Sequence, residues 1–456
     1  MKILFVLIVV VLHAFLGASQ ADDCSGIWNG DQQLNRSSSV AIRLTLLHHQ
    51  HPCSPIRHPT RTDLPLTWHR SRTLDRERML ASRLFFRRRR RASATNVSVP
   101  VTIDAAGASY GFVAQIGLGT PPTMQSVLID SAASFSWVQC KPCGDGCYEQ
   151  DGPLMDVLAS TTYRRVPCSS PLCLSASAAT MAHTDCSPGY NGACLYRITY
   201  MDRSASKGCL STDTLTVGEE SFPEFVFGCS RRHEGAFGRY AGIFGFAIGR
   251  LSFFSQVVEK AHQYRAFSYY LPSPSSVGYI QVGRYDEGGL SFTPMLTAGH
   301  DYYLILTGIT VDGCSLDLAD DGQGQPSSAA TTDDAHLYLD LGSALSILPR
   351  RVHARLSDAV AERMRGYDRV RSWPGCFDPA YLSTERAVPA VEMHLKGGAR
   401  LVLDEDKLMY KRPDGRQCLG FVPGSFFLLG SMQLQMIYVA QDVERSRMGF
   451  SNEQYE

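Results

Sequence analysis

Two aspartates, Asp130 and Asp340, lie directly after apolar runs in two segments that resemble each other, SVLIDSAAS and LYLDLGSALS. Small or hydroxylated residues follow each aspartate. Further along each half, two apolar residues precede a glycine, in IFG ending at Gly245 and in LLG ending at Gly430. The same two signatures in the same order predict a duplicated lobe that carries one aspartate on a loop of each copy.

Two carboxyl groups that meet at the interface of such lobes can perform hydrolysis. At a few ångströms they cannot both ionise, so they share one proton. The ionised carboxylate can take a proton from a water molecule while the protonated carboxyl polarises a peptide carbonyl, which is general acid–base catalysis without a covalent intermediate. The alternative is that each aspartate is a turn or cap residue. The matched pair favours the catalytic interpretation, with activity in acid.

The elements that must position these residues are mostly strands. After Pro100 the chain contains short apolar runs rich in β-branched and aromatic residues, bounded by Gly, Pro, Asp or Ser, such as EFVFGCS, YAGIFGFAIG, HLYLDLGS and GSFFLLGS. Helical periodicity is limited to stretches such as residues 349–365, where apolar residues recur at every fourth position after an initial proline. An all-β fold with a few short helices is predicted.

The N-terminal region predicts secretion and processing. Residues 1–21 contain one lysine, an apolar run too short to span a bilayer, and small residues near the end, which is typical of a cleaved signal peptide. No later run is longer, so we expect no membrane contact after signal cleavage. Asn35 and Asn96 each begin a sequon for glycosylation.

The formal net charge of zero hides an asymmetry. Residues 1–91 hold 15 Lys and Arg against 6 Asp and Glu, and the remainder holds 29 against 38. The basic part ends in five consecutive arginines at residues 87–91. This pattern favours a prosegment over residues 22–92 that is held partly by charge and cut near the arginines. The alternatives are a solvated linker and a patch for nucleic acid or heparin; we expect no nucleic-acid partner.

Fourteen cysteines in a secreted chain predict disulfides rather than thiols. Half of them crowd into residues 140–194, which predicts an insertion stapled by disulfides. The CxxC spacing of Cys140 and Cys143 resembles half of a zinc site, but no second half completes it. We therefore predict no metal and no cofactor.

Taken in order, these segments resemble the pepsin-like aspartic proteases, and more closely their plant secreted, nepenthesin-like branch. IGLGTPP followed by LIDSAASFSWVQC is similar to the family's first catalytic loop, with Trp137 seven residues beyond the aspartate. CLYRITYMDRSASKG resembles the flap, so Tyr200 is similar to the tyrosine that closes over substrate. The resemblance covers about residues 108–453.

The resemblance implies a bilobal fold with pseudo-two-fold lobes, the first over residues 93–287 with a flap near residue 200, the second over residues 288–456. It implies that Asp130 and Asp340 are the catalytic pair and that Tyr200 and Trp137 bind substrate. The implied partners are a protein or peptide substrate in the interlobe cleft and the chain's own prosegment. We expect a monomer.

The first loop departs from the family's Asp-Thr-Gly-Ser motif. Ser131 keeps the hydroxyl that would bond to the opposite loop. Ala132 replaces the glycine that lets backbone amides approach the carboxylate, and Ala133 lacks the hydroxyl that orients it.

The second loop and the flap depart as well. Gly342 and Ser343 keep the family pattern. Leu341 replaces the Thr or Ser whose hydroxyl would bond from the second loop to the first. Met201 and Arg203 stand where the family has flap glycines, which predicts a stiffer or altered closure.

The resemblance also bears on the cysteines. Cys376 and Cys418 resemble the bridge of the C-terminal lobe, while Cys209 and Cys314 look like additions. The disulfide candidates are Cys140, Cys143, Cys147, Cys168, Cys173, Cys186, Cys194, Cys209, Cys229, Cys314, Cys376 and Cys418.

Two functions follow from these observations. The first is an acid-acting aspartic endopeptidase, made as a zymogen and delivered to the extracellular space or the vacuole. The second is a weakened or inactive binding protein on the same scaffold, similar to the plant inhibitors of microbial xylanase. The surviving aspartates favour the first, and the substitutions around them favour the second.

Overall fold

The computed structural model describes most of the chain beyond residue 110 and short pieces before it. The described residues are 24, 27, 42–48, 51–56, 111–179, 183–186, 192–200, 204–235, 237–273, 275–299, 301–318, 335–370, 375–379, 387–412 and 414–451. The predicted signal peptide, the arginine run, Asn35, Asn96, Met201 and Arg203 lie outside them.

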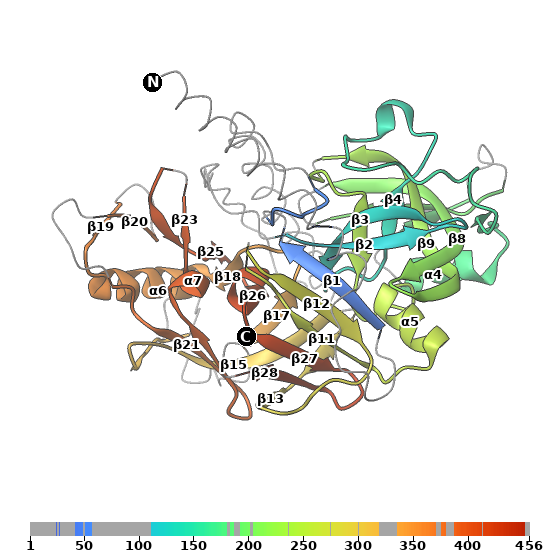
Figure 1. Cartoon of the computed structure of the whole chain (residues 1–456). Helices are drawn as coiled ribbons and strands as arrows, with labels where there is room; N and C mark the ends of the chain where they lie inside the picture. The colour runs from blue at the N-terminus through green and yellow to red at the C-terminus, as the bar shows by residue number, and fades with distance from the viewer. Residues whose placement is uncertain are drawn as a thin grey trace, which may run out of the picture.

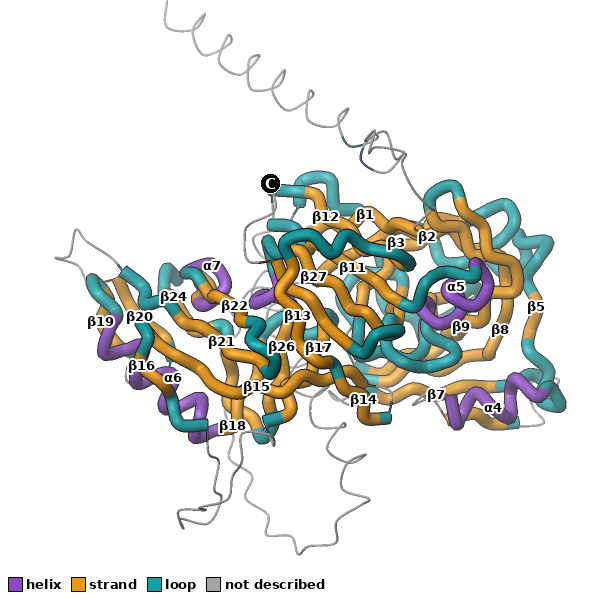
Figure 2. Tube along the Cα trace, turned by 90° about the horizontal axis from the view of Figure 1, so that it is seen from below, coloured by secondary structure: helices purple, strands orange, loops and turns teal. Residues whose placement is uncertain are grey.

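Strands dominate the described residues, and the few helices lie outside the sheets (Figures 1 and 2). The helices are α4 (Pro171–Ala179), α5 (Phe253–Ala261), α6 (Arg350–Arg363) and α7 (Glu405–Leu408), with short 3-10 turns at Gly144–Gly146 and Ser431–Leu434. The helix predicted over residues 349–365 is α6, and its four-residue apolar step buries Val352, Leu356 and Val360. The all-β fold class is therefore confirmed.

The largest sheet joins strands from both halves of the chain. Its order is β13 (Leu290–Pro294), β28 (Arg447–Ser451), β27 (Tyr438–Asp442), β11 (Ala266–Tyr270), β12 (Val277–Val282), β1 (Ile42–His48), β2 (Phe112–Leu118), β3 (Thr123–Asp130), β10 (Gly242–Gly245), β4 (Trp137–Gln139), β9 (Glu220–Glu234), β8 (Ala205–Val217), β7 (Leu195–Thr199) and β6 (His183–Asp185), with β5 (Arg164–Arg165) on β8. Because β27 pairs with β11, the C-terminal strands continue the sheet of the first half.

Two smaller sheets build the rest of the second half. One runs β22 (Arg400–Leu403), β21 (Val391–Leu395), β15 (Asp301–Val311), β17 (His336–Asp340), β26 (Phe427–Gly430), β18 (Ser346–Pro349) and β25 (Phe421–Gly424), with β14 (Leu296–Ala298) and β16 (Cys314–Ser315) on β15. The other runs β19 (Tyr367–Arg369), β20 (Cys376–Pro379), β24 (Gln417–Leu419) and β23 (Met409–Lys411). One large apolar cluster includes buried residues from both halves.

The two halves repeat one arrangement of strands. In the first, β10 lies parallel to β3 and antiparallel to β4, and β4 lies parallel to β9. In the second, β26 lies parallel to β17 and antiparallel to β18, and β18 lies parallel to β25. The internal repeat seen in the sequence is thus a repeat of structure, with each aspartate at the end of the corresponding strand.

Strand β1 comes from the predicted prosegment and lies inside the large sheet, between β12 and β2 (Figure 1). It pairs antiparallel with β12 over its length and with β2 at one end. Its alternate residues Ile42, Leu44 and Leu46 are buried in the main apolar cluster. A strand of the predicted prosegment is therefore part of the core of the protein.

Six disulfides are present among the described residues: Cys24–Cys53, Cys140–Cys229, Cys143–Cys147, Cys168–Cys186, Cys173–Cys194 and Cys376–Cys418. The bridge between Cys376 and Cys418 was expected, whereas that between Cys24 and Cys53 was not proposed. The sulfur atoms of Cys168, Cys173 and Cys186 lie within 4.8 Å of one another, but each belongs to a bridge.

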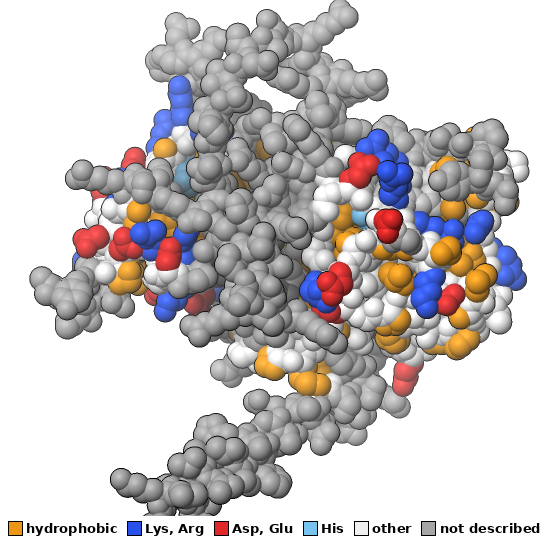
Figure 3. Space-filling view, turned by 90° about the horizontal axis from the view of Figure 1, so that it is seen from above, with side chains coloured by type: hydrophobic (Ala, Val, Ile, Leu, Met, Phe, Trp, Pro, Cys, Tyr) orange, Lys and Arg blue, Asp and Glu red, His pale blue; other side chains and the backbone are white. Residues whose placement is uncertain are grey.

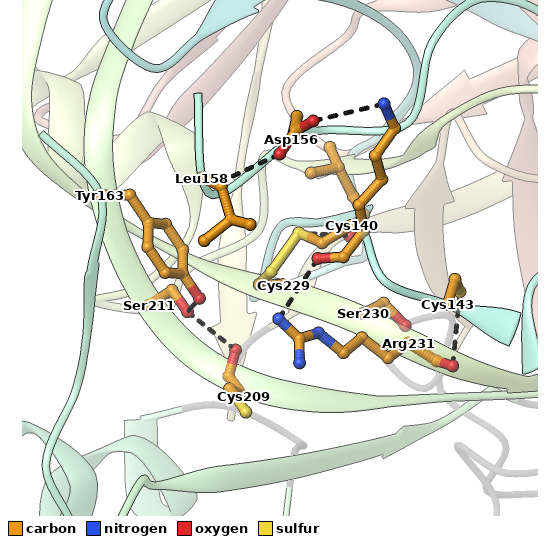
Figure 4. Close-up of a disulfide and its surroundings, with 12 residues drawn as sticks. Cys140, Cys143, Asp156, Leu158, Tyr163, Cys209, Ser211, Cys229, Ser230 and Arg231 are labelled. Atoms are coloured by element: carbon orange, nitrogen blue, oxygen red, sulfur yellow. Dashed lines mark hydrogen bonds and ion pairs between the residues drawn. A yellow bond between two sulfur atoms is a disulfide. The ribbon is translucent and has the colours of Figure 1, made fainter. Parts of the chain in front are cut away.

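The prediction of disulfides for Cys209 and Cys314 is wrong, because both are free thiols. Cys209 is buried in β8 and faces Cys229 across the ladder with β9, but Cys229 is already bonded to Cys140 (Figure 4). Cys314 is exposed on β16. Crowding of cysteines in the sequence did not reveal which of them lack a partner.

The described surface mixes charges of both signs. Figure 3 shows acidic and basic side chains interspersed over the described part of one face. None of the helices in the described residues has the length and apolar content needed to cross a membrane.

If β1 is part of the core, truncating one of its buried side chains must destabilise the protein. Leu46 is 0% exposed, so we expect Leu46→Ala to lower the free energy of unfolding by about 2–5 kcal/mol. Urea denaturation measures this, with Thr45→Ala, at a partly exposed neighbouring position, as the control. Equal losses in the two variants would show that β1 does not pack as described.

Candidate active site

The ends of two equivalent strands position the candidate catalytic aspartates. Asp130 ends β3 opposite Gly245 of β10, and Asp340 ends β17 opposite Gly430 of β26. Neither glycine tolerates a side chain, because a Cβ would lie 2.2 Å from the Ala133 carbonyl oxygen in the first case and 2.7 Å from a backbone oxygen in the second. The glycine of each IFG or LLG signature thus allows the loop that follows the aspartate to pack against it.

A serine hydroxyl supports each of these glycines in the same way. The backbone N–H of Gly245 donates to Ser136 Oγ at 3.0 Å, and that of Gly430 donates to Ser346 Oγ at 2.8 Å. Both bonds are buried. The two lobes therefore share side-chain support as well as strand order.

The Asp130 carboxylate is held by backbone amides of its own loop. The N–H groups of Ala132 and Ala133 both donate to Asp130 Oδ1 at 2.9 Å. The residue is 3% exposed. Alanine at position 132 therefore leaves room for the amide contact that a glycine would allow.

The Asp340 carboxylate has contacts on both oxygens. The N–H of Gly342 donates to Oδ1 at 2.8 Å, and the Ser343 hydroxyl donates to Oδ2 at 2.5 Å. Asp340 is 4% exposed and Ser343 is fully buried. Because Ala133 has no hydroxyl, the first loop lacks the counterpart of the Ser343 bond, and the two carboxylates have unequal surroundings.

One hydrogen bond joins the two loops directly. The backbone N–H of Leu341 donates to Ser131 Oγ at 2.9 Å, in a buried position. Leu341 has no hydroxyl with which to return the bond. Its side chain is buried and packs in the main apolar cluster. This bond brings the loops of Asp130 and Asp340 together, although they are far apart in the sequence.

A third carboxyl group, Asp301, lies near the pair and was not identified from the sequence. It begins β15, and burial together with the negative charges of Asp340 and Asp130 raises the pKa of its carboxyl to about 7. The one feature of the sequence that could have pointed to Asp301 is its position directly before the apolar run YYLIL. Because that run is not adjacent to either aspartate motif, only the fold reveals the approach.

Trp137 and Tyr200, the two residues predicted to bind substrate, lie in contact. Trp137 Nε1–H donates to the Tyr200 hydroxyl at 2.5 Å. Phe237 packs edge-on against both rings, with centroids 5.1 and 5.8 Å away. The start of the flap is therefore anchored to the strand that follows the first aspartate loop.

His233 completes this aromatic cluster and was also missed in the sequence. Its ring lies 5.1 Å from that of Trp137 and 5.6 Å from that of Phe237. Nδ1 contacts the carbonyl oxygen of Gly146 at 3.1 Å and Nε2 contacts Ser230 Oγ at 2.7 Å. Because a carbonyl only accepts, Nδ1 carries the proton of the neutral ring. Burial lowers the pKa of His233 to about 4.

Removing the hydroxyl between the loops tests their coupling. Ser131→Ala leaves the buried Leu341 amide without its partner, so we expect the free energy of unfolding to fall by about 1–3 kcal/mol. Ser131→Thr keeps the hydroxyl and is the matched control, with a smaller loss. Denaturant titration measures both, and an alanine variant as stable as the parent would show that the bond does not couple the loops.

The half-buried, neutral ring of His233 predicts a dependence of stability on pH. The folded pKa of about 4 lies below the ordinary value of 6.5, so the unfolded chain binds more protons between these values and stability falls as pH decreases from about 6.5 to about 4. We expect His233→Gln to lose less stability than the parent over this interval.

Urea denaturation at several pH values between 7 and 4 measures the difference, and His262→Asn, at an exposed histidine, is the control. Parallel pH dependences of the parent and His233→Gln would contradict a half-buried, neutral ring.

The comparisons with known proteins agree with this geometry. Residues 112–284 match the family model described as xylanase inhibitor N-terminal, and residues 301–452 match the one described as xylanase inhibitor C-terminal. An aspartyl protease family protein of Arabidopsis thaliana is 31% identical over 376 residues, which cover 79% of this chain and 76% of the relative. The aspartic proteinase nepenthesin-2 of Nepenthes gracilis is 27% identical, over 74% of this chain and 76% of its own.

Among solved structures, the basic 7S globulin from soybean matches with a TM-score of 0.60 and 21% identity, over 76% of this chain and 94% of that one. At that identity the likeness concerns the fold alone. The family models cover most of the chain, and the Arabidopsis relative is matched over more than two thirds of both sequences. The chain belongs to the plant branch of the pepsin-like aspartic protease family.

Proposed function

We propose that this chain is an aspartic endopeptidase that hydrolyses peptide bonds in acid with Asp130 and Asp340 as the catalytic pair. The observation that carries the proposal is the bond from the Leu341 amide to Ser131 Oγ, which joins the two loops that hold these carboxyls. Backbone amides already bind one oxygen of each carboxylate. These amides orient the carboxyls for a water molecule bound between the loops.

The chemistry follows from two carboxyls that share one proton. The ionised group accepts a proton from the water, whose oxygen attacks the carbonyl carbon, and the protonated group donates to the carbonyl oxygen. The C–N bond of the tetrahedral intermediate then breaks: the carboxyl that took the water proton gives it to the leaving nitrogen, and the other carboxylate regains a proton from the hydroxyl formed on the former carbonyl oxygen. The hydroxyl of Ser343 holds Asp340 Oδ2, whereas Ala133 offers Asp130 no such bond, so the two carboxyls are not equivalent.

The substitutions around the pair weaken this machinery without removing it. Ala132 still gives its amide to Asp130, so the carboxylate keeps its orientation. The missing hydroxyls at Ala133 and Leu341 each remove one hydrogen bond, worth on the order of 1–3 kcal/mol if buried. That corresponds to about 5- to 150-fold in rate where the whole loss is felt in the transition state.

Secretion and zymogen formation belong to the same proposal. Six disulfides are typical of an oxidising compartment such as the extracellular space or the vacuole. Strand β1 ties the predicted prosegment to the body of the protein through its pairing with β12 and β2. We therefore infer that processing near the arginines leaves β1 in place, held by its pairing in the sheet.

A second candidate is a binding protein that keeps the fold without the activity. Two observations favour it: both matching family models are described as xylanase inhibitor, and the first loop lacks an orienting hydroxyl at Ala133. This candidate predicts a peptide or protein ligand that binds and is not cleaved.

Replacing either aspartate separates the two candidates. We expect the acidified full-length chain to cleave a denatured protein at about pH 3–5, and Asp340→Asn and Asp130→Asn each to lower the rate by about 10²- to 10⁴-fold, because each removes one proton-transfer group. Mass spectrometry of the products measures cleavage, and Asp368→Asn, at an exposed position of β19, is the matched control. Absence of cleavage by the folded parent under all these conditions would leave the binding protein as the function.

A further inference from the structure

We propose that Asp301 is a specificity-determining residue, and that it selects peptides carrying a lysine or arginine next to the scissile bond. The inference rests on the proposed function, since it assumes that substrate lies over Asp130 and Asp340. It adds a substrate class, cationic peptides, to the general hydrolysis of peptide bonds.

The strand register places Asp301 beside the catalytic pair. Tyr303 of β15 is paired with Tyr338 of β17 in an antiparallel ladder. Side chains of a strand alternate between faces, so Asp301 shares a face with Tyr303, and Asp340 shares it with Tyr338. Moving two residues along each strand from the paired tyrosines leads to Asp301 on one strand and Asp340 on the other.

Aromatic rings continue this face away from the pair. The Tyr303 ring lies 5.7 Å from that of Tyr338 and 4.4 Å from that of His336, and the Tyr338 ring lies 6.4 Å from that of Phe426. Tyr303, His336 and Tyr338 are all partly exposed. Such rings suit the aliphatic stem of a lysine or arginine and attract its charged end.

No cation among the described residues neutralises Asp301. Its carboxylate makes no hydrogen bond or ion pair with the described part of the chain, and its side chain is partly exposed. A carboxylate near two other acidic groups repels anionic ligands and is stabilised by an incoming cation. The chemistry that fits is therefore a substrate ammonium or guanidinium rather than an acidic or purely apolar side chain.

The charges around Asp301 make the preference for a lysine or arginine side chain depend on pH. Within the described ranges, the titratable groups that face it are Asp340 and Tyr338 of β17, with His336 further along that strand, and Asp130 from the first lobe. The neighbouring carboxylates favour protonated Asp301 in the resting protein, whereas a bound cation favours the ionised form. The preference for lysine therefore grows as pH rises from about 4 to about 7, where protons compete less.

Binding of uncleavable peptides tests the inference apart from hydrolysis. The probes are hydroxyethylene peptides of one sequence. The members of a pair carry either lysine or its uncharged counterpart norleucine next to the hydroxyethylene unit, and there is one pair for each side of that unit. Calorimetry measures their affinity for the full-length chain, acidified and returned to pH 4, 5.5 or 7. We expect about tenfold tighter binding of lysine on one side at the higher pH.

Three variants show whether Asp301 is responsible. Asp301→Asn should lose the lysine preference while binding norleucine as the parent does, and Asp301→Glu should regain part of it. Asp368→Asn, at an exposed carboxyl far along the chain, should change neither affinity. An equal loss of both peptides in Asp301→Asn would indicate a merely structural role and overturn the inference.

Parallel assays of the cleavable peptides keep the two proposals distinguishable. Cleavage with equal affinities for lysine and norleucine would overturn the role of Asp301 and leave the endopeptidase intact. A lysine preference that depends on Asp301, without any cleavage, would support the role of Asp301 and remove the endopeptidase. No binding of either peptide would overturn the role of Asp301.

Discussion

The hydrogen bond from the Leu341 amide to Ser131 Oγ is the contact on which the candidate active site depends. The loops that it joins leave equivalent strands in two halves of the chain, and neither loop can bring two carboxyls together alone. The partners are buried, so a lost bond leaves an amide with no water to replace it. In this chain a side-chain hydroxyl takes part from the first loop alone, at Ser131, because the equivalent position of the second loop is Leu341, whose side chain lies in the apolar core.

Around that contact the duplicated strands do most of the positioning. In each lobe a glycine without room for a Cβ and a serine hydroxyl hold the backbone beside the aspartate. The lobes differ in the carboxylate contacts, where Asp340 gains a hydroxyl from Ser343 and Asp130 has amides on Oδ1. Unequal surroundings of this kind are what distinct acid and base roles require.

The sequence was sufficient for features that repeat or follow one strand. The echo of an aspartate and a later glycine predicted equivalent positions for Asp130 and Asp340, and the apolar step after Pro349 predicted α6. It was insufficient where distant segments meet. The approach of Asp301 depends on the register of β15 against β17, and the place of β1 depends on pairing across the whole sheet. Local residue patterns carry neither kind of information.

Titration of the active site with a statine-type peptide inhibitor tests most directly whether the two loops form one catalytic centre. The hydroxyl of such an inhibitor occupies the place of the attacking water between the carboxyls. The account predicts that hydrolysis of a denatured protein in acid falls linearly to zero at one inhibitor per chain. Hydrolysis that persists at saturating inhibitor would contradict it.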